Sequence, residues 1–178
     1  GEWRRSQYIR EFVDRVGGFE RCRKYTHQGE TKLTEVVVRR MTAADSVFRE
    51  DARFLRSHTN RVAKFALPSP FLIAVRYWHE DYSRDAYPTL QHFLDHLAEL
   101  LAREAQALVE AGIDIVQPDD PALTYFCDRR LTEGSAADIH DERLRRTWDA
   151  DRQFPEALAA INRVAEGLQA EVHLHCCH

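Results

Sequence analysis

The sequence predicts an α/β protein in which parallel strands alternate with helices, and three observations lead to this fold class. Short apolar strands begin near residues 62, 113 and 171. Helical periodicity fills the intervals between them, which indicates right-handed βαβ crossovers. Polar residues gather just after the strands, where parallel sheets place their ligand sites. Such a sheet either closes into a (β/α)8 barrel or stays open and doubly wound.

Length and composition are those of one ordinary globular domain spanning residues 1–178. A net charge of −4 gives no electrostatic reason to expect a nucleic-acid or membrane partner. No apolar run is long enough to span a bilayer. The four cysteines do not form the framework of a disulfide-rich secreted protein, so we expect a reducing, cytoplasmic location.

The first sixty residues are predicted to form two helices separated by an excursion. Apolar residues at helical spacing predict the first helix, and they are Ile9, Phe12, Val13 and Val16. Gly17-Gly18 ends this helix. Residues 20–40 are polar and then strand-like, which indicates an excursion or a hairpin arm. A second helix is expected from Thr42 to about His58, with Phe48 on its buried side.

The remaining chain is predicted to alternate strands with helices. After a strand over 62–67, Pro68-Ser69-Pro70 predicts an irregular loop, and the type of the apolar run 71–75 stays open. The later elements are a long helix from about Pro88 to Gly112, a strand over 113–117, helices near 138–150 and from Pro155 to about Leu168, and a final strand over 172–176.

The end of the chain carries metal-binding chemistry. Residues two apart on a strand share a face, so His173, His175 and Cys177 are predicted to point to one side. Imidazole nitrogen and thiolate sulfur are ligands that zinc prefers, although two of them do not complete a tetrahedral site. Cys176 is predicted to lie in the core. Five histidines are predicted to lie on the surface, and they are His27, His58, His92, His96 and His140.

Three stretches together resemble the catalytic barrel of cobalamin-independent methionine synthase. They are Gly1–Arg5, Val116–Leu123 and His173–Cys177, in the same order and at similar spacing as in that family. The resemblance implies a (β/α)8 TIM barrel, of which residues 1–178 would supply about half, from the end of the second strand to the end of the fifth. We therefore expect the ordered portion of a longer protein, or a barrel completed by another chain segment or by a homo-oligomer.

The resemblance also implies an activity in methionine biosynthesis. A zinc-dependent methyltransferase would move a methyl group from a methyltetrahydrofolate-type donor to the thiol of homocysteine. His175 and Cys177 would bind the zinc, Glu2 and Asp119 would hold the substrate's ammonium, and Trp78 would stack on the donor's pterin. No catalytic residue beyond the metal ligands is implied.

Two alternative functions stay open. The acidic residue that the family uses towards the folate falls on Tyr125, which favours a relative that takes its methyl group from a methyl-corrinoid partner or acts on another thiol such as coenzyme M. A non-catalytic zinc-binding module is the second alternative.

The predicted site residues also have structural interpretations. Asp119 and Asp120 are equally consistent with a solvated turn after a strand. Glu2 is consistent with an acid that stabilises a helix N-terminus, and Trp78 with a residue that covers an apolar rim.

Overall fold

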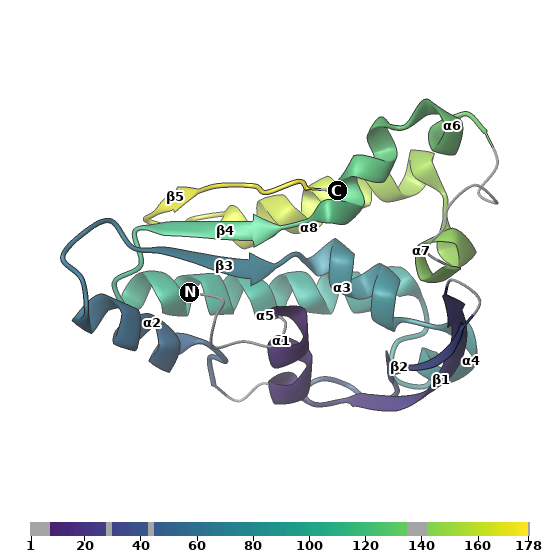
Figure 1. Cartoon of the computed structure of the whole chain (residues 1–178), viewed down its shortest axis with the longest axis horizontal. Helices are drawn as coiled ribbons and strands as arrows, with labels where there is room; N and C mark the ends of the chain where they lie inside the picture. Colours follow the sequence, from purple (N-terminus) through teal and green to yellow (C-terminus); the bar gives the residue numbers. More distant parts are fainter. Residues whose placement is uncertain (1–7, 28–29, 43–44, 135–141, 178) are drawn as a thin grey trace.

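Three parallel strands form the centre of the computed structural model, which describes residues 8–27, 30–42, 45–134 and 142–177. They are β3 (Lys64–Pro68), β4 (Ile115–Asp119) and β5 (Glu171–Val172), and they lie side by side in this order (Figure 1). The predicted parallel α/β sheet is therefore confirmed. The described residues form an open sheet, and closure into a barrel stays a prediction.

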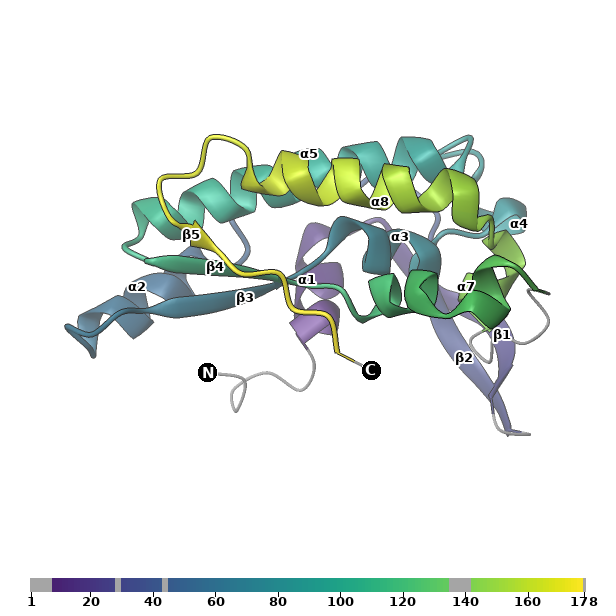
Figure 2. The same cartoon turned by 90° about the horizontal axis from the view of Figure 1, so that it is seen from above.

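One face of the sheet is covered by two helices, and the other face carries the polar residues. Helices α5 (Leu90–Glu110) and α8 (Ala150–Ala165) lie next to each other along the covered face (Figure 2). Leu67 and Val116 are fully buried in the core on this side. Because alternate strand residues point to opposite faces, Gln117 and Asp119 belong to the other face. Within the described residues, Figure 1 shows no helix in front of that face.

The first helix and the hairpin agree with the sequence prediction. Helix α1 (Tyr8–Val16) buries the predicted apolar stripe and lies beside β3, on the side away from β4 (Figure 1). The excursion is an antiparallel hairpin of β1 (Phe19–His27) and β2 (Glu30–Val37). Gly18 has a φ of 85°, and a Cβ there would lie 2.6 Å from the Arg39 carbonyl oxygen. This turn therefore requires glycine.

The second helix begins later than predicted, because a buried carboxylate takes the backbone donors that precede it. Helix α2 spans Arg49–Ser57, so the expected start at Thr42 is wrong. The Glu104 side chain on α5 accepts hydrogen bonds from the backbone N–H groups of Val47 and Phe48 at 2.8 and 2.7 Å. The hydrogen bonds from Glu104 on α5 thus keep the residues directly before Arg49 out of the helix, although their hydrophobic periodicity predicted a helical turn.

A helix replaces the irregular loop predicted after β3. Helix α3 (Pro70–Tyr77) begins directly after the strand, and the Ser69 side chain accepts a hydrogen bond from the Leu72 N–H at 3.1 Å. Ser at the N-cap followed by Pro at the first helical position is a favourable helix start. Pro68-Ser69-Pro70 therefore ends the strand and starts a helix in one step.

The C-terminal helices lie close to their predicted positions, with shifted starts. The further helices are α4 (Glu80–Ser83), the 3-10 helix η2 (Pro121–Cys127), α6 (Arg129–Thr132) and α7 (Glu142–Thr147). Helix α8 begins at Ala150, because the Asp149 side chain caps the Arg152 N–H at 3.2 Å. Pro155, the predicted start, therefore lies inside the helix. Within the described ranges, no helix combines the length and apolarity needed to cross a bilayer.

Candidate functional site

The carboxyl ends of the three parallel strands are fastened to one another by backbone hydrogen bonds. The Ser69 N–H donates to the Asp119 carbonyl at 3.1 Å, which joins β3 to β4. The Asp120 N–H donates to the His175 carbonyl at 2.9 Å, and the His175 N–H donates to the Pro118 carbonyl at 3.0 Å. Ser69, Asp120 and His175 therefore lie at one edge of the sheet, although more than a hundred residues separate the first from the last.

Asp119 and His175 are direct neighbours across this edge. They form a parallel β-bridge, and adjacent strands lie about 4.8 Å apart. The Asp119 side chain is only 6% exposed, and its Oδ1 accepts a hydrogen bond from Gln117 Nε2 at 2.7 Å. The backbones that carry a carboxylate and an imidazole are thus paired on two neighbouring segments at the carboxyl ends of the strands.

Asp120 is fully buried beneath this pair, so the interpretation of Asp119-Asp120 as a solvated turn is wrong. The Ser69 hydroxyl donates a hydrogen bond to Asp120 Oδ2, and the Ala122 N–H donates to Asp120 Oδ1 at 3.1 Å. Burial raises the pKa of the Asp120 carboxyl to about 6, against the opposing effect of these hydrogen bonds. Asp120 was given no function from the sequence, although an aspartate directly before a proline is a signal for a capped turn.

The His-x-Cys segment is more exposed than predicted. The expected strand over 172–176 is regular only through Val172, and His175, Cys176 and Cys177 are all exposed. The placement of Cys176 in the core is wrong, because within the described residues β5 has a neighbouring strand on one side only. Partial burial raises the pKa of the Cys176 thiol, and the nearby Asp120 carboxylate adds to this effect.

The residues present fit a zinc ion by type but not by number. Imidazole and thiolate are suitable donors, and His175 and Cys177 would supply one of each. Among the described residues, no three His, Cys, Asp or Glu side chains gather closely enough to hold a metal ion. His178 and Glu2 lie outside the described residues. A complete metal site would therefore need ligands beyond those that the structure describes.

The remaining predicted residues are placed as follows. Trp78 is 7% exposed, and its indole N–H donates to the Tyr87 carbonyl at 3.0 Å, so the ring packs in the core rather than on an open surface. Tyr125 is half-buried and packs edge-on against Trp148. His96 is half-buried and hydrogen-bonded to the Tyr87 hydroxyl at 2.7 Å, which corrects its assignment to the surface.

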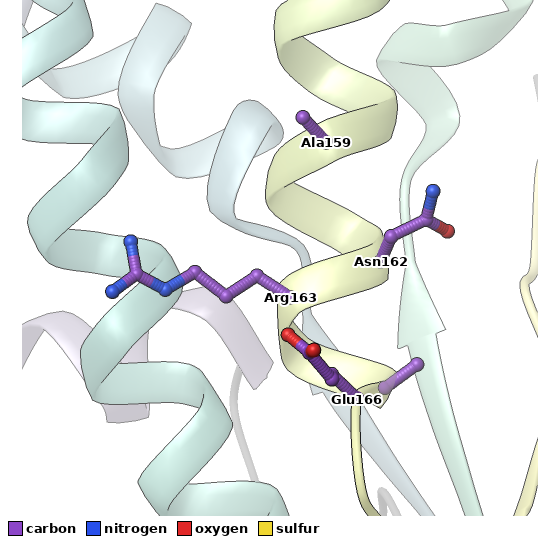
Figure 3. Close-up of a pocket in the computed structure, with 5 residues that line it drawn as sticks. Ala159, Asn162, Arg163 and Glu166 are labelled. Carbon is purple, nitrogen blue, oxygen red and sulfur yellow. The ribbon is translucent and has the colours of Figure 1, made fainter.

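Two surface depressions among the described residues lie away from the strand ends. One is on α8, where Arg163 extends across to the neighbouring helix and pairs with Glu99 at 3.0 Å (Figure 3). The second lies where α5 meets the segment before α2, and Glu104 is among its lining residues. Neither brings together His, Cys and carboxylate groups, so the strand ends remain the candidate site.

Curated relatives share the whole length of this chain. It is 24% identical over 180 residues to a methionine synthase from Pyrococcus abyssi, covering 100% of this chain and 45% of that protein. It is 26% identical over 191 residues to a 5-methyltetrahydropteroyltriglutamate–homocysteine methyltransferase from Halalkalibacterium halodurans, covering 100% of this chain and 21% of that protein. No protein-family model matches the chain.

A solved structure shows the same likeness. A B12-independent methionine synthase from a Shewanella species, in complex with selenomethionine, superposes with a TM-score of 0.70 at 27% identity. The match covers 99% of this chain and 45% of that one, so the chain spans about half the length of this relative and of the archaeal one. The predicted resemblance to cobalamin-independent methionine synthases is confirmed.

Proposed function

We propose that this chain, which is related along its whole length to the cobalamin-independent methionine synthases, supplies part of the active site of a homocysteine methyltransferase. The observation that carries the proposal is the pairing of Asp119 with His175 across the ends of β4 and β5. It unites the two functions that the reaction needs, a carboxylate for an amino acid's ammonium and a ligand for a thiol-activating metal.

Asp119 binds the ammonium of homocysteine in this proposal. A carboxylate held by Gln117 is oriented before the substrate arrives, and charge-assisted hydrogen bonds to an ammonium are about twice as strong as neutral ones. The low exposure of Asp119 reduces competition from water. Glu2 would share this task, as the family resemblance implies.

His175 and Cys177 would hold a zinc ion together with ligands from outside the described residues. When bound, the metal stabilises a thiolate, which is the nucleophilic form of the substrate's thiol at neutral pH. Asp119 would direct the thiol of homocysteine towards the metal, because it holds the ammonium of the same molecule next to His175. The thiol loses its proton as the thiolate forms. The S–C bond would then form as the bond from the methyl carbon to the donor breaks, and the electron pair of the broken bond leaves with the donor, which takes up a proton in place of the methyl group.

The adjacent cysteines provide a matched pair of variants that tests the proposal. Cys177→Ser removes the proposed ligand, so we expect zinc retention and methyl transfer to homocysteine to fall by at least about 100-fold. Cys176→Ser changes the neighbouring exposed thiol and is expected to leave both unchanged. Zinc content after dialysis and methionine formation are the measurements, made on the full-length natural protein. Full activity in a metal-free preparation would contradict the proposal.

The methyl donor is proposed to be a methyltetrahydrofolate, with a methyl-corrinoid as the second candidate. Tyr125 favours the second candidate, because the family resemblance aligns Tyr125 with the acidic residue that the family uses towards the folate. Methionine formation with methyltetrahydrofolate and with methylcobalamin, measured side by side, separates the two. Zinc binding without transfer from either donor to homocysteine or coenzyme M would instead indicate a non-catalytic zinc-binding module.

A further inference from the structure

A buried polar pair lies directly behind the proposed substrate and metal residues. Ser69 and Asp120 are both 0% exposed, and neither is a substrate or metal ligand in the proposed function. Ser69 follows β3 and Asp120 follows β4, so their contact joins the ends of two strands that are distant in sequence. Burying a carboxylate is costly unless its hydrogen bonds are made. The burial of this carboxylate against Ser69 therefore needs a structural or functional reason.

The contacts of Asp120 fix the direction in which the chain leaves β4. One carboxylate oxygen accepts from the Ser69 hydroxyl, and the other accepts from the Ala122 N–H in the first turn of η2. The Ser69 hydroxyl oxygen also caps α3 through the Leu72 N–H. The side chain of Asp120 is thus held from two sides, and this sets the orientation of the peptide group between Asp119 and Asp120.

That peptide group is the one that holds His175. Its N–H is the Asp120 donor to the His175 carbonyl, and the residue on its other side is Asp119. The backbone hydrogen bonds of His175 within the described residues are this one and the bond from its own N–H to Pro118. Cys176 and Cys177 beyond it are exposed. The placement of the His-x-Cys segment against Asp119 therefore depends on the peptide that Asp120 orients.

We propose that Asp120, held by Ser69, is a positioning residue that sets the distance between the ammonium-binding Asp119 and the metal-binding segment His175–Cys177. The inference rests on the proposed function and extends it to residues that touch neither substrate nor metal. Loss of the Asp120 side chain lets the strand ends shift relative to one another. Zinc affinity and homocysteine binding then weaken together, because they depend on one spacing.

Three variants of the full-length protein separate hydrogen-bonded positioning from charge. Asp120→Ala removes both contacts and is expected to weaken zinc binding and to lower kcat/KM for homocysteine by about 10- to 100-fold, as is usual for the outer partners of metal ligands. Asp120→Asn keeps the shape, with its oxygen accepting from Ala122 and its amide donating to Ser69, and is expected to stay within about threefold of wild type. Ser69→Ala removes one of the two contacts of Asp120, together with the cap of α3, and is expected to fall between them.

Asp128→Ala is the control, because Asp128 also caps the turn that follows it, accepting from the Arg130 N–H at 3.0 Å, but it precedes α6 rather than following a strand. Zinc affinity is measured by competition with a chelator, below the unfolding midpoint of each variant. A purely structural role of Asp120 would lower the midpoint and leave the zinc affinity and the KM of the folded protein unchanged. That result would overturn the inference.

The outcomes distinguish this inference from the proposed function. If wild type binds zinc and methylates homocysteine while folded Asp120→Ala and Ser69→Ala match it, only the positioning role fails. If Asp120→Ala does not fold, Ser69→Ala and Asp120→Asn decide the matter by the same two measurements. If wild type neither binds zinc nor transfers a methyl group, the proposed function fails and the positioning role fails with it.

Discussion

Two buried carboxylates, Glu104 in the helix layer and Asp120 at the strand ends, hold the chain in similar ways but differ in their surroundings. Glu104 is 4% exposed and accepts from the Ser46 hydroxyl and from two backbone N–H groups. Asp120 accepts from a hydroxyl and one backbone N–H. Only Asp120 adjoins Asp119 and His175. Burial of a carboxylate therefore does not by itself indicate a functional site; its neighbours do.

The largest effect is expected from Glu104→Ala, which tests the structural half of this comparison. Removing the carboxylate leaves buried backbone donors without an acceptor, so we expect the free energy of unfolding to fall by roughly 3 kcal/mol. Glu99→Ala on the same helix is the control, because Glu99 makes an exposed pair with Arg163, worth less than about 1 kcal/mol. Urea unfolding measures both. A loss of zinc affinity in folded Glu104→Ala would contradict the contrast with Asp120.

The second prediction concerns the pH dependence that Asp120 gives to stability. Its folded-state pKa of about 6 lies above the usual 3.8, so the folded protein binds the proton more tightly than the unfolded chain. The stabilising contribution is fully present below about pH 4 and is lost as the pH rises through 6, by at most about 3 kcal/mol. Unfolding free energies of wild type and Asp120→Asn across this range provide the test. Equal slopes for the two proteins would contradict the raised pKa.

The third and smallest effect has the opposite sign and comes from the helix side. Burial and the nearby Arg40 guanidinium lower the pKa of His96, whose Nδ1 is hydrogen-bonded to the Tyr87 hydroxyl. The unfolded chain therefore binds this proton more tightly, and stability rises with pH until the usual value of 6.5 is passed. His96→Gln should flatten that rise while leaving the Asp120 dependence in place. If the free energy of unfolding of His96→Gln rose with pH as steeply as that of wild type, another group would be responsible for the rise.

Local sequence signals predicted the elements better than their starting points. The stripe of α1, the glycines that follow it and the presence of three parallel strands were correct, although the last strand is shorter than predicted. Hydrophobic period and turn chemistry act within a few residues, so these features could be predicted locally. The start of α2 was missed because Glu104 lies more than fifty residues away in the sequence. The start of α3 was missed although Ser69-Pro70 carries a known capping pattern, since two prolines also suit a loop.

Among the site residues, side-chain chemistry was predicted better than burial. The types of residue at the strand ends, together with the family resemblance, were enough to propose Asp119, His175 and Cys177. The burial of Asp120, the exposure of Cys176 and the core position of Trp78 were not predictable, because each depends on which segments cover that residue.

The alternation of strands and helices and the chemistry of the residues at the strand ends follow from local patterns, because hydrophobic period and side-chain type are local properties. The pairing of Asp119 with His175, and the burial of Asp120 against Ser69, follow from the folded arrangement of distant segments. This arrangement depends on the register of the parallel strands. Their crossovers are long, so the pairing across the sheet is set by packing and backbone hydrogen bonds between distant segments.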